Sequence, residues 1–462
     1  MSLREDARRI AALAWPVFVG QVSIVAFATV DTVLVGRHSP SELAALAVGA
    51  SAYITVFIGL MGVVMAVGPI AGQHFGARQY AAAGHQLHQA AWVAAGLSLV
   101  GALALLFPWP FLALASLEPA VEASARAYMS VLALALPPSL LFAAYRGFNV
   151  AVSRPKAVMA MQLVGLSIKL PLSWLLVAGA PGLGLPALGA VGGGVASALA
   201  YWTALLLALQ VLRRDAFYDR FELRGRGWHR PDGGAIRAQL RLGVPMGLGV
   251  FIEVSGFAMM AVFVARLGTT VVAGHQIVAN LVSLMFMVPM ALASACSTLV
   301  AQSIGARDLA SARRYGWQGV RLGCGLALLL GGLVWWLREP VVGLYTQDAA
   351  VAAVAVSLLA WLVLFHLADA LQIQAAFALR GWKVATRPTL IYAVTLWGVG
   401  QGGGYLLAFD PLGVAPAGLQ GASGYWAAST AGMTLAALAL TWLLARTAAA
   451  GRELRPAPTS AG

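Results

Sequence analysis

The sequence is poor in charged residues. Asp, Glu, Lys and Arg make up 10% of its 462 residues, against about 25% in a typical soluble domain. Hydrophobic residues make up 60%, and the mean hydropathy is +0.81. This composition excludes an ordinary soluble protein and predicts a polytopic membrane protein.

Several chemical signatures are also missing. The two cysteines, Cys296 and Cys324, each lie in an apolar segment, which is typical of small packed residues rather than of a disulfide or metal pair. The apolar segments contain no H-x-x-E-H metal triad and no nucleophile with its base, so we expect neither an enzyme nor a cofactor. There is no G-x-x-x-x-G-K-[ST] motif, so this chain has no nucleotide site of its own.

Long apolar runs dominate what is present. A membrane-spanning helix needs roughly 20 mainly apolar residues, and runs of this length exclude the short alternating strands of a membrane barrel. The N-terminal residues lead from charges into a long apolar segment without a cleavage site, so we expect a retained first helix. The predicted fold is all-α with twelve transmembrane helices, at 10–36, 43–72, 87–107, 127–145, 157–179, 187–212, 242–265, 271–301, 316–337, 350–379, 389–409 and 424–445.

The distribution of basic residues sets the expected topology. Lys and Arg outnumber Asp and Glu by 30 to 17, for a net charge of +13. Most of the basic residues lie in loops on one side of the predicted membrane, above all in 213–241. The positive-inside rule makes that side cytoplasmic and places both termini there. The basic composition is therefore a topology signal, and we expect no nucleic-acid partner.

The longest polar connection divides the chain into two similar halves. We expect an N-lobe at 1–212, a cytoplasmic linker at 213–241, and a C-lobe at 242–462 that ends in a short cytoplasmic tail. Pro16 and Pro245 are 229 residues apart, and so are the strings GQHFGAR and AQSIGAR, which end at Arg78 and Arg307.

Each predicted copy has six helices, an even number, so both copies have the same orientation. They are then related by a pseudo-twofold axis along the membrane normal, with a cavity between the lobes. This arrangement favours alternating access over a static pore.

Three carboxylates lie well inside the predicted spans. They are Asp31, Glu253 and Asp369, and each charge at mid-membrane costs about 3 kcal/mol or more. One such residue can be a structural polar contact. Three of them, spread over both lobes, favour an ion or proton site, with Glu253 and Asp369 as Na⁺ ligands.

Lys169 is a basic residue inside a span, two residues before Pro171. An unpaired lysine there is costly, and 43–72 apart, the helices 10–36 and 157–179 belong to the same lobe. Our hypothesis is that Lys169 pairs with Asp31. The alternative is that its side chain extends to the membrane interface.

Other polar and aromatic residues lie near the carboxylates in sequence. Phe257 is one turn after Glu253, and Asp369 shares a helical stripe with Phe365 and Gln372. Gln276 and Tyr53 are further candidates for the substrate cavity, with packing as the alternative. His366 either shares the face of Asp369 or is a packed core histidine.

Together these segments resemble the NorM branch of the multidrug and toxic compound extrusion transporters. The strings that carry the resemblance are FATVDTVLVGR, FIEVSGFAMMAVFVARLG, GHQIVANLVSLMFMVPMALASACSTLVAQSIGA and LADALQIQAAFALRGW. The resemblance implies an antiporter of the bacterial inner membrane, which exports amphiphilic, often cationic drugs in exchange for Na⁺ or H⁺. It also implies cation-site roles for Asp31, Glu253 and Asp369, and an aromatic beside them at Phe257.

Two positions depart from the family pattern. Where relatives commonly carry asparagines near the first carboxylate, this chain has Lys169 and Ser173, and where some relatives have a tyrosine it has Phe365. The second change removes an oxygen from a Na⁺ site. We expect a monomer in the lipid bilayer. A flippase for lipid or polyprenol-linked substrates is the nearest alternative, although the inward charges are mostly acidic.

Overall fold

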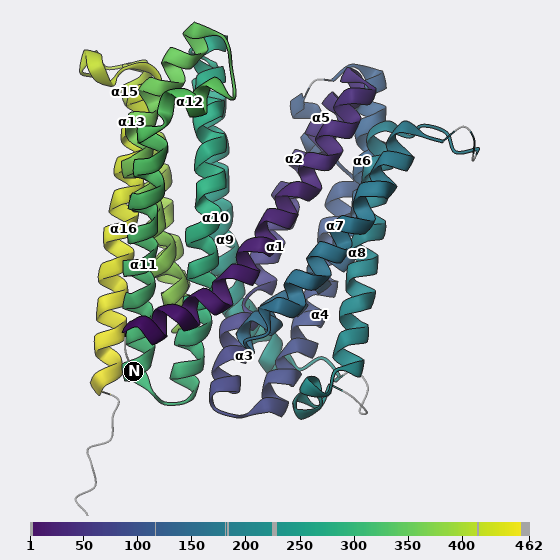
Figure 1. Cartoon of the computed structure of the whole chain (residues 1–462), viewed down its shortest axis with the longest axis vertical. Coiled ribbons are helices and arrows are strands. Elements are labelled where there is room, and N and C mark those ends of the chain that lie inside the picture. The colour runs from purple at the N-terminus through teal and green to yellow at the C-terminus, as the bar shows by residue number, and fades with distance from the viewer. Residues whose placement is uncertain are drawn as a thin grey trace, which may run out of the picture. The chain divides into compact units, whose positions relative to one another are not determined.

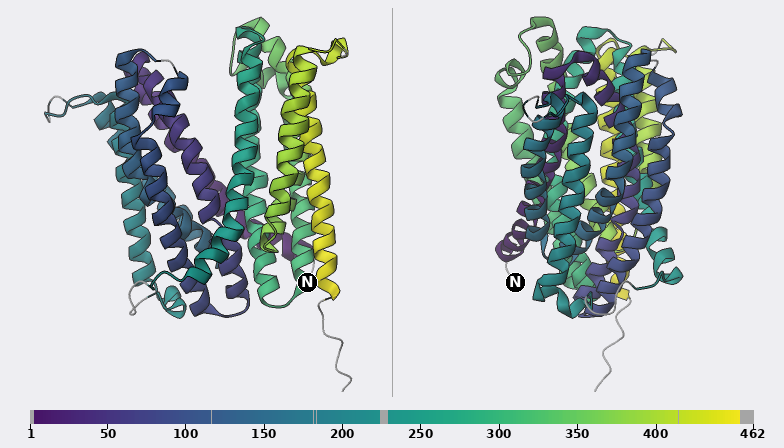
Figure 2. Two further views of the ribbon diagram at one scale, coloured as in Figure 1. Left: turned by 180° about the vertical axis from the view of Figure 1, so that it is seen from behind. Right: turned by 90° about the vertical axis from the view of Figure 1, so that its right-hand side faces the viewer.

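The computed structural model describes residues 3–115, 117–180, 182, 184–223, 229–413 and 415–453, and these residues are almost entirely helical (Figure 1). They fall into two compact units. We call Trp15–Gly247 the N-unit, and Met1–Ala14 with Leu248–Gly462 the C-unit. Within each unit the long helices run side by side, as Figure 2 shows.

Helix α6 is the centre of the N-unit, where it packs against α2, α4 and α8. Helix α7 packs against α8, and the short helices cover the bundle ends. The elements are α2 (Pro40–Val64), α3 (Val67–Gly76), α4 (Tyr80–Leu106), α5 (Trp109–Ala115), α6 (Pro119–Ala151), α7 (Pro155–Ala178), α8 (Gly189–Arg214) and the 3₁₀-helix η2 (Ala216–Phe221).

Helix α13 has the corresponding central place in the C-unit, where it packs against α10, α11 and α16. The elements are α10 (Thr269–Gly305), α11 (Leu309–Trp336), α12 (Arg338–Gly343), α13 (Ala349–Gly381), α14 (Thr386–Tyr392), the π-helix η3 (Ala393–Gly402), α15 (Gly403–Phe409), the 3₁₀-helix η4 (Ala417–Leu419) and α16 (Gly421–Glu453).

Two helices belong to both units: α1 (Leu3–His38) and α9 (Gly233–Ala265). The chain passes from one unit to the other inside each helix, within about one turn of Pro16 or Pro245. The start of α1 is held in the C-unit, where Asp6 forms an ion pair with Arg314 at 2.6 Å. The start of α9 is held in the N-unit, where Gln239 Nε2 donates to the carbonyl of Gln86 at 2.9 Å.

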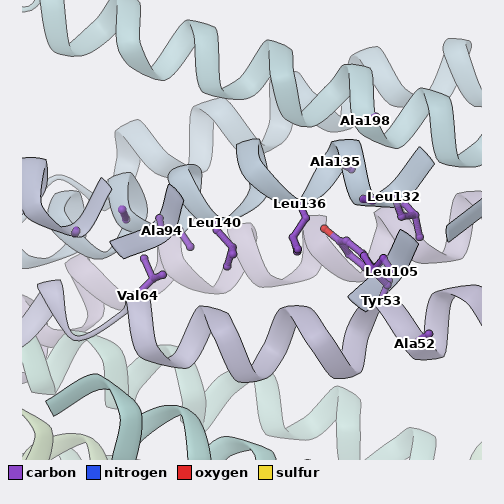
Figure 3. Close-up of a cluster of buried hydrophobic side chains, with 14 of the residues drawn as sticks. Ala52, Tyr53, Val64, Ala94, Leu105, Leu132, Ala135, Leu136, Leu140 and Ala198 are labelled. Carbon is purple, nitrogen blue, oxygen red and sulfur yellow. The ribbon is translucent and has the colours of Figure 1, made fainter. Parts of the chain in front are cut away.

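The N-unit core is a dry layer of small and branched side chains between α2, α4, α6 and α8. Figure 3 shows this layer, with Leu136 and Leu140 of α6 fully buried. Small residues let the helices approach closely, as is usual in membrane bundles. At Gly49 of α2, for example, a Cβ would lie 2.4 Å from the ring of Tyr128.

The predicted repeat is visible in the backbone. Arg78 and Arg307 both adopt left-handed φ angles, 58° and 60°, in the turns after α3 and α10. Ser153 and Lys383 do the same after α6 and α13, with φ of 62° and 58°. In each turn the left-handed residue donates its N–H three residues back along the ending helix. Equivalent turns in both units show that the two halves share one fold.

The twelve-helix prediction is confirmed. Among the described residues, eleven helices are long and apolar enough to cross a membrane. The segment predicted at 389–409 is the twelfth, and it is built from three consecutive pieces, α14, η3 and α15. Its winding changes from α to π and back, which is why it is not a single α-helix.

The left-handed arginines give a test of the repeated turn. We expect Arg78→Gly and Arg307→Gly to be more stable than the matching alanine variants by about 1 kcal/mol, because glycine has no Cβ to strain a positive φ. Thermal unfolding of the purified protein in detergent measures the difference. At the control position, Arg321 within α11, alanine should be the more stable of the two. The same order at all three positions would contradict the assigned turns.

Candidate functional site

The N-unit holds a buried ion pair. Lys169 of α7 donates from Nζ to Asp31 Oδ2 of α1 at 2.7 Å. The Lys169 side chain is 1% exposed and that of Asp31 is 7% exposed. The ammonium also lies 4.9 Å from the ring centroid of Phe27, a cation–π distance. The lysine therefore stays inside the unit and does not extend to an interface.

Two serines complete the surroundings of this pair. Ser173 Oγ donates to Asp31 Oδ1 at 3.1 Å, so both carboxylate oxygens are bonded. Ser197 of α8 accepts a hydrogen bond from Lys169 and lies 3.2 Å from Asp31 Oδ2. Helix α8 comes this close because of Gly193, where a Cβ would lie 3.2 Å from the Asp31 carboxyl carbon. Ser197 was not identified from the sequence, where it is one small residue in a glycine- and alanine-rich run.

The C-unit holds the other two carboxylates, joined by an amide. Gln372 of α13 donates from Nε2 to Glu253 Oε1 at 2.9 Å and to Asp369 Oδ1 at 3.0 Å. Asp369 and Gln372 are buried, while Glu253 of α9 is partly exposed. A neutral amide thus bridges the two acids and uses one N–H on each.

Tyr392 and Arg380 extend this site. The Tyr392 hydroxyl, at the end of α14, donates to Gln372 Oε1 and so fixes which end of the amide faces the acids. The guanidinium of Arg380, in the last turn of α13, acts electrostatically on Glu253 and Tyr392. The sequence does not indicate the role of Tyr392, because nothing along the chain shows that α14 contacts α13 at this point.

A pocket lies beside the C-unit carboxylates. Its volume is about 470 Å³, and it is lined by Phe257, Gln276, Ile277, Ala279, Asn280, Ser283 and Tyr345. The pocket residue Phe257 is one turn from Glu253, and its ring lies 6.4 Å from that of Phe365, one turn before Asp369. Tyr345 donates to Asn280 Oδ1 at 2.9 Å, which fixes one side of the lining. Two of the predicted cavity residues, Phe257 and Gln276, therefore line an actual pocket.

The remaining predicted residues are packed. Tyr53 is buried in the N-unit core, where its hydroxyl lies 2.9 Å from Ser139 Oγ (Figure 3). Phe365 is buried against Trp426, with ring centroids 5.6 Å apart. His366 is fully buried, and neither ring nitrogen has a hydrogen-bond partner among the described residues. In this conformation all three occupy the packing positions that were the alternative to cavity surface or a shared face.

Metal coordination is limited to what two carboxylates can provide. In the part of the chain that the structure describes, no three His, Cys, Asp or Glu side chains are grouped to hold a metal ion. Glu253 and Asp369 have carboxylate oxygens, which hard cations prefer. The N-unit pair already has its cation in Lys169.

The buried ion pair predicts strong coupling between its two members. Asp31→Asn or Lys169→Met alone should lower the free energy of unfolding by about 3–5 kcal/mol, because each leaves an uncompensated buried charge. The double variant should recover much of that loss. Thermal unfolding in detergent measures all three.

Glu122 and Arg126 are the matched control, a surface pair 3.0 Å apart on one helix. Breaking such a pair costs about 0–1 kcal/mol. Losses at Asp31 and Lys169 no larger than at Glu122, or losses that simply add in the double variant, would contradict a compensating pair.

Comparison with known proteins agrees with this architecture. The profile of the MatE family matches residues 16–175 and 245–406, two copies whose starts are 229 residues apart. "Probable multidrug resistance protein NorM" of Aromatoleum aromaticum is 42% identical over 433 residues, which are 93% of this chain and 92% of that protein. "Multidrug resistance protein PmpM" of Pseudomonas aeruginosa is 32% identical and covers 97% of this chain and 93% of its own.

Solved structures share the fold at low identity. The eukaryotic MATE transporter AtDTX14 matches with a TM-score of 0.85 at 19% identity, over 98% of this chain and 99% of its own. The Vibrio cholerae MATE transporter VcmN in its bent form matches with a TM-score of 0.83 at 15% identity, over 98% and 99%. The two family matches and the relatives over nearly the whole chain show that this protein belongs to the MatE family, the multidrug and toxic compound extrusion (MATE) transporters.

Proposed function

We propose that this protein is a secondary antiporter that exports amphiphilic, mainly cationic compounds in exchange for Na⁺ or H⁺. The coupling site is the Glu253–Gln372–Asp369 cluster of the C-unit. The observation that carries the proposal is the charge balance of the two buried sites, which differs between the units.

The C-unit site lacks one positive charge when both acids are ionised. Arg380 is the cation that acts on Glu253, and Gln372 contributes hydrogen bonds but no charge. An entering proton, Na⁺ or organic cation supplies the missing charge. Competition between the drug and the coupling ion for this place produces antiport, provided that the affinity for the ion differs between the two access states.

The N-unit site is already neutral, because Lys169 is bonded directly to Asp31. A coupling ion can bind there only if the ammonium moves away or loses its proton. We therefore assign Asp31 and Lys169 a supporting part in transport, and Glu253 and Asp369 the binding of the coupling ion.

The pocket beside Phe257 fits an amphiphilic substrate. An aromatic ring and two aliphatic side chains form part of its lining, while Gln276, Asn280 and Ser283 offer hydrogen-bonding groups. Apolar surface with a few polar groups is typical of small-molecule sites. Because Phe257 also contacts Phe365, a ligand in the pocket is within two side chains of both acids.

The topology completes the proposal. We propose that the basic loops and both termini face the cytoplasm of a bacterium, and that the protein is a monomer in the inner membrane. The lobes 1–212 and 242–462 are the bodies that alternate access, joined by the linker 213–241. The names of the relatives, which describe multidrug resistance proteins, support export of drugs.

Efflux from everted vesicles tests the coupling site. Ethidium flux is driven in turn by an imposed Na⁺ gradient and by an imposed pH gradient. We expect Glu253→Gln and Asp369→Asn each to reduce the driven flux at least about tenfold, since one lost buried charge contact is worth more than 1.4 kcal/mol. Glu122→Gln, which removes an exposed carboxylate, is the control and should transport normally.

Two results would overturn the proposal. Full driven flux in both variants, at normal protein levels in the membrane, would exclude the assigned site. Movement of labelled lipid between leaflets without any ethidium flux would favour the flippase.

A further inference from the structure

The segment that crosses the membrane as α14, η3 and α15 has an unusual middle. In η3 the backbone is a π-helix over ten residues, Ala393–Gly402. A π-helix bonds residue i to residue i+5, is rare, and occurs mostly as single turns at functional sites. A run of this length therefore calls for a specific explanation.

Two side chains of η3 bind the backbone of α9 on either side of Glu253. Trp397 Nε1 donates to the carbonyl of Ile252 at 3.1 Å, and Gln401 Nε2 donates to the carbonyl of Gly256 at 2.8 Å. Both donors converge on one spot, since a Cβ at Gly256 would lie 3.6 Å from Trp397 Nε1 and 3.7 Å from Gln401 Nε2. The turn of α9 that carries the carboxylate is thus held by two hydrogen bonds from outside.

The same segment also reaches the second half of the site. Tyr392, the residue immediately before η3, donates to Gln372 Oε1. Gln372 in turn bridges Glu253 and Asp369. One stretch of ten residues, from Tyr392 to Gln401, therefore contacts both helices that supply the acids.

The wide winding explains how these three side chains reach one side. In an α-helix, residues five apart are about 140° apart around the axis and residues nine apart are about 180° apart. Tyr392 would then point away from Gln401. In a π-helix a turn takes between four and five residues, so Tyr392, Trp397 and Gln401 fall on a common face.

Helix α16 supports η3 from another side. The Tyr425 hydroxyl donates to Gln401 Oε1 at 2.6 Å, which leaves the Gln401 amide nitrogen directed at Gly256. Gly432 allows close packing, since a Cβ there would lie 2.5 Å from the Thr395 carbonyl oxygen. The wide helix is therefore held in place and not a loosely packed distortion.

We propose that η3 is a positioning device for the coupling site: Trp397 and Gln401 hold the Glu253 turn of α9, and Tyr392 holds Gln372 between the two acids. This inference rests on the proposed function, since it assigns η3 a role in binding the coupling ion. The three residues do not themselves bind the ion. They set the separation and direction of the groups that do.

The test measures the concentration of driving cation that gives half-maximal ethidium efflux, in the ion that drives the wild type. Trp397→Phe, Gln401→Met and Tyr392→Phe each remove one hydrogen bond with little change of volume. We expect each to shift that concentration by about threefold or more, in line with the loss of a single buried hydrogen bond. Ethidium binding without a gradient should stay within twofold of wild type.

Trp202 gives a matched control. Its Nε1 donates to the carbonyl of Leu134 at 3.2 Å in the N-unit, and it is 41% exposed against 40% for Trp397. Trp202→Phe therefore loses the same kind of bond far along the chain from the carboxylates, and it should leave the cation dependence unchanged. Equal cation dependence in wild type and all three variants of the η3 face would overturn the proposal, as would an equal shift in Trp202→Phe.

The outcome is separable from that of the proposed function. If Glu253→Gln and Asp369→Asn abolish driven efflux while the η3 variants behave as wild type, the site is right and the positioning role is wrong. If Glu253→Gln and Asp369→Asn retain efflux, the coupling site itself is wrong.

Discussion

A carboxylate inside a membrane bundle needs compensation, because an isolated charge there costs about 3 kcal/mol or more. The two units meet this requirement differently. Asp31 has a resident cation, Lys169, and hydrogen bonds on both oxygens. Glu253 and Asp369 share the N–H groups of one neutral amide. A pair that carries its own cation is suited to stability, whereas an incompletely neutralised pair is suited to binding an exchangeable one.

The two units show how a repeated scaffold supports different chemistry. Their turns match down to the left-handed backbone of Arg78 and Arg307. Their charged sites do not match, since at the repeat offsets the counterparts of Asp31, Glu253 and Asp369 are Met260, Ile24 and Ala135. The backbone is constrained by helix packing, which tolerates few changes. The polar sites depend on a few side chains and can diverge independently.

The π-helix η3 illustrates the same separation within one segment. Its irregular winding gives up standard helical hydrogen bonding, and it persists because α9 and α16 both bind it. The benefit is directional, since one face of a single helix reaches two neighbours. Membrane helices tolerate such irregularity where surrounding helices satisfy the polar groups.

The sequence alone determined the helix number, the repeat and the three buried carboxylates, because membrane burial imposes long apolar runs in which any charge stands out. It also indicated the Asp31–Lys169 pair, since two opposite charges in one lobe each require a partner. The tertiary structure decided which neutral residues complete the sites: Ser197, Tyr392, Trp397 and Gln401. It also placed Tyr53 in the core, away from any pocket. Serine, tyrosine, tryptophan and glutamine occur in helices for many reasons. Their roles here depend on which helices touch and at what rotation, and that is set by packing between residues far apart in the chain.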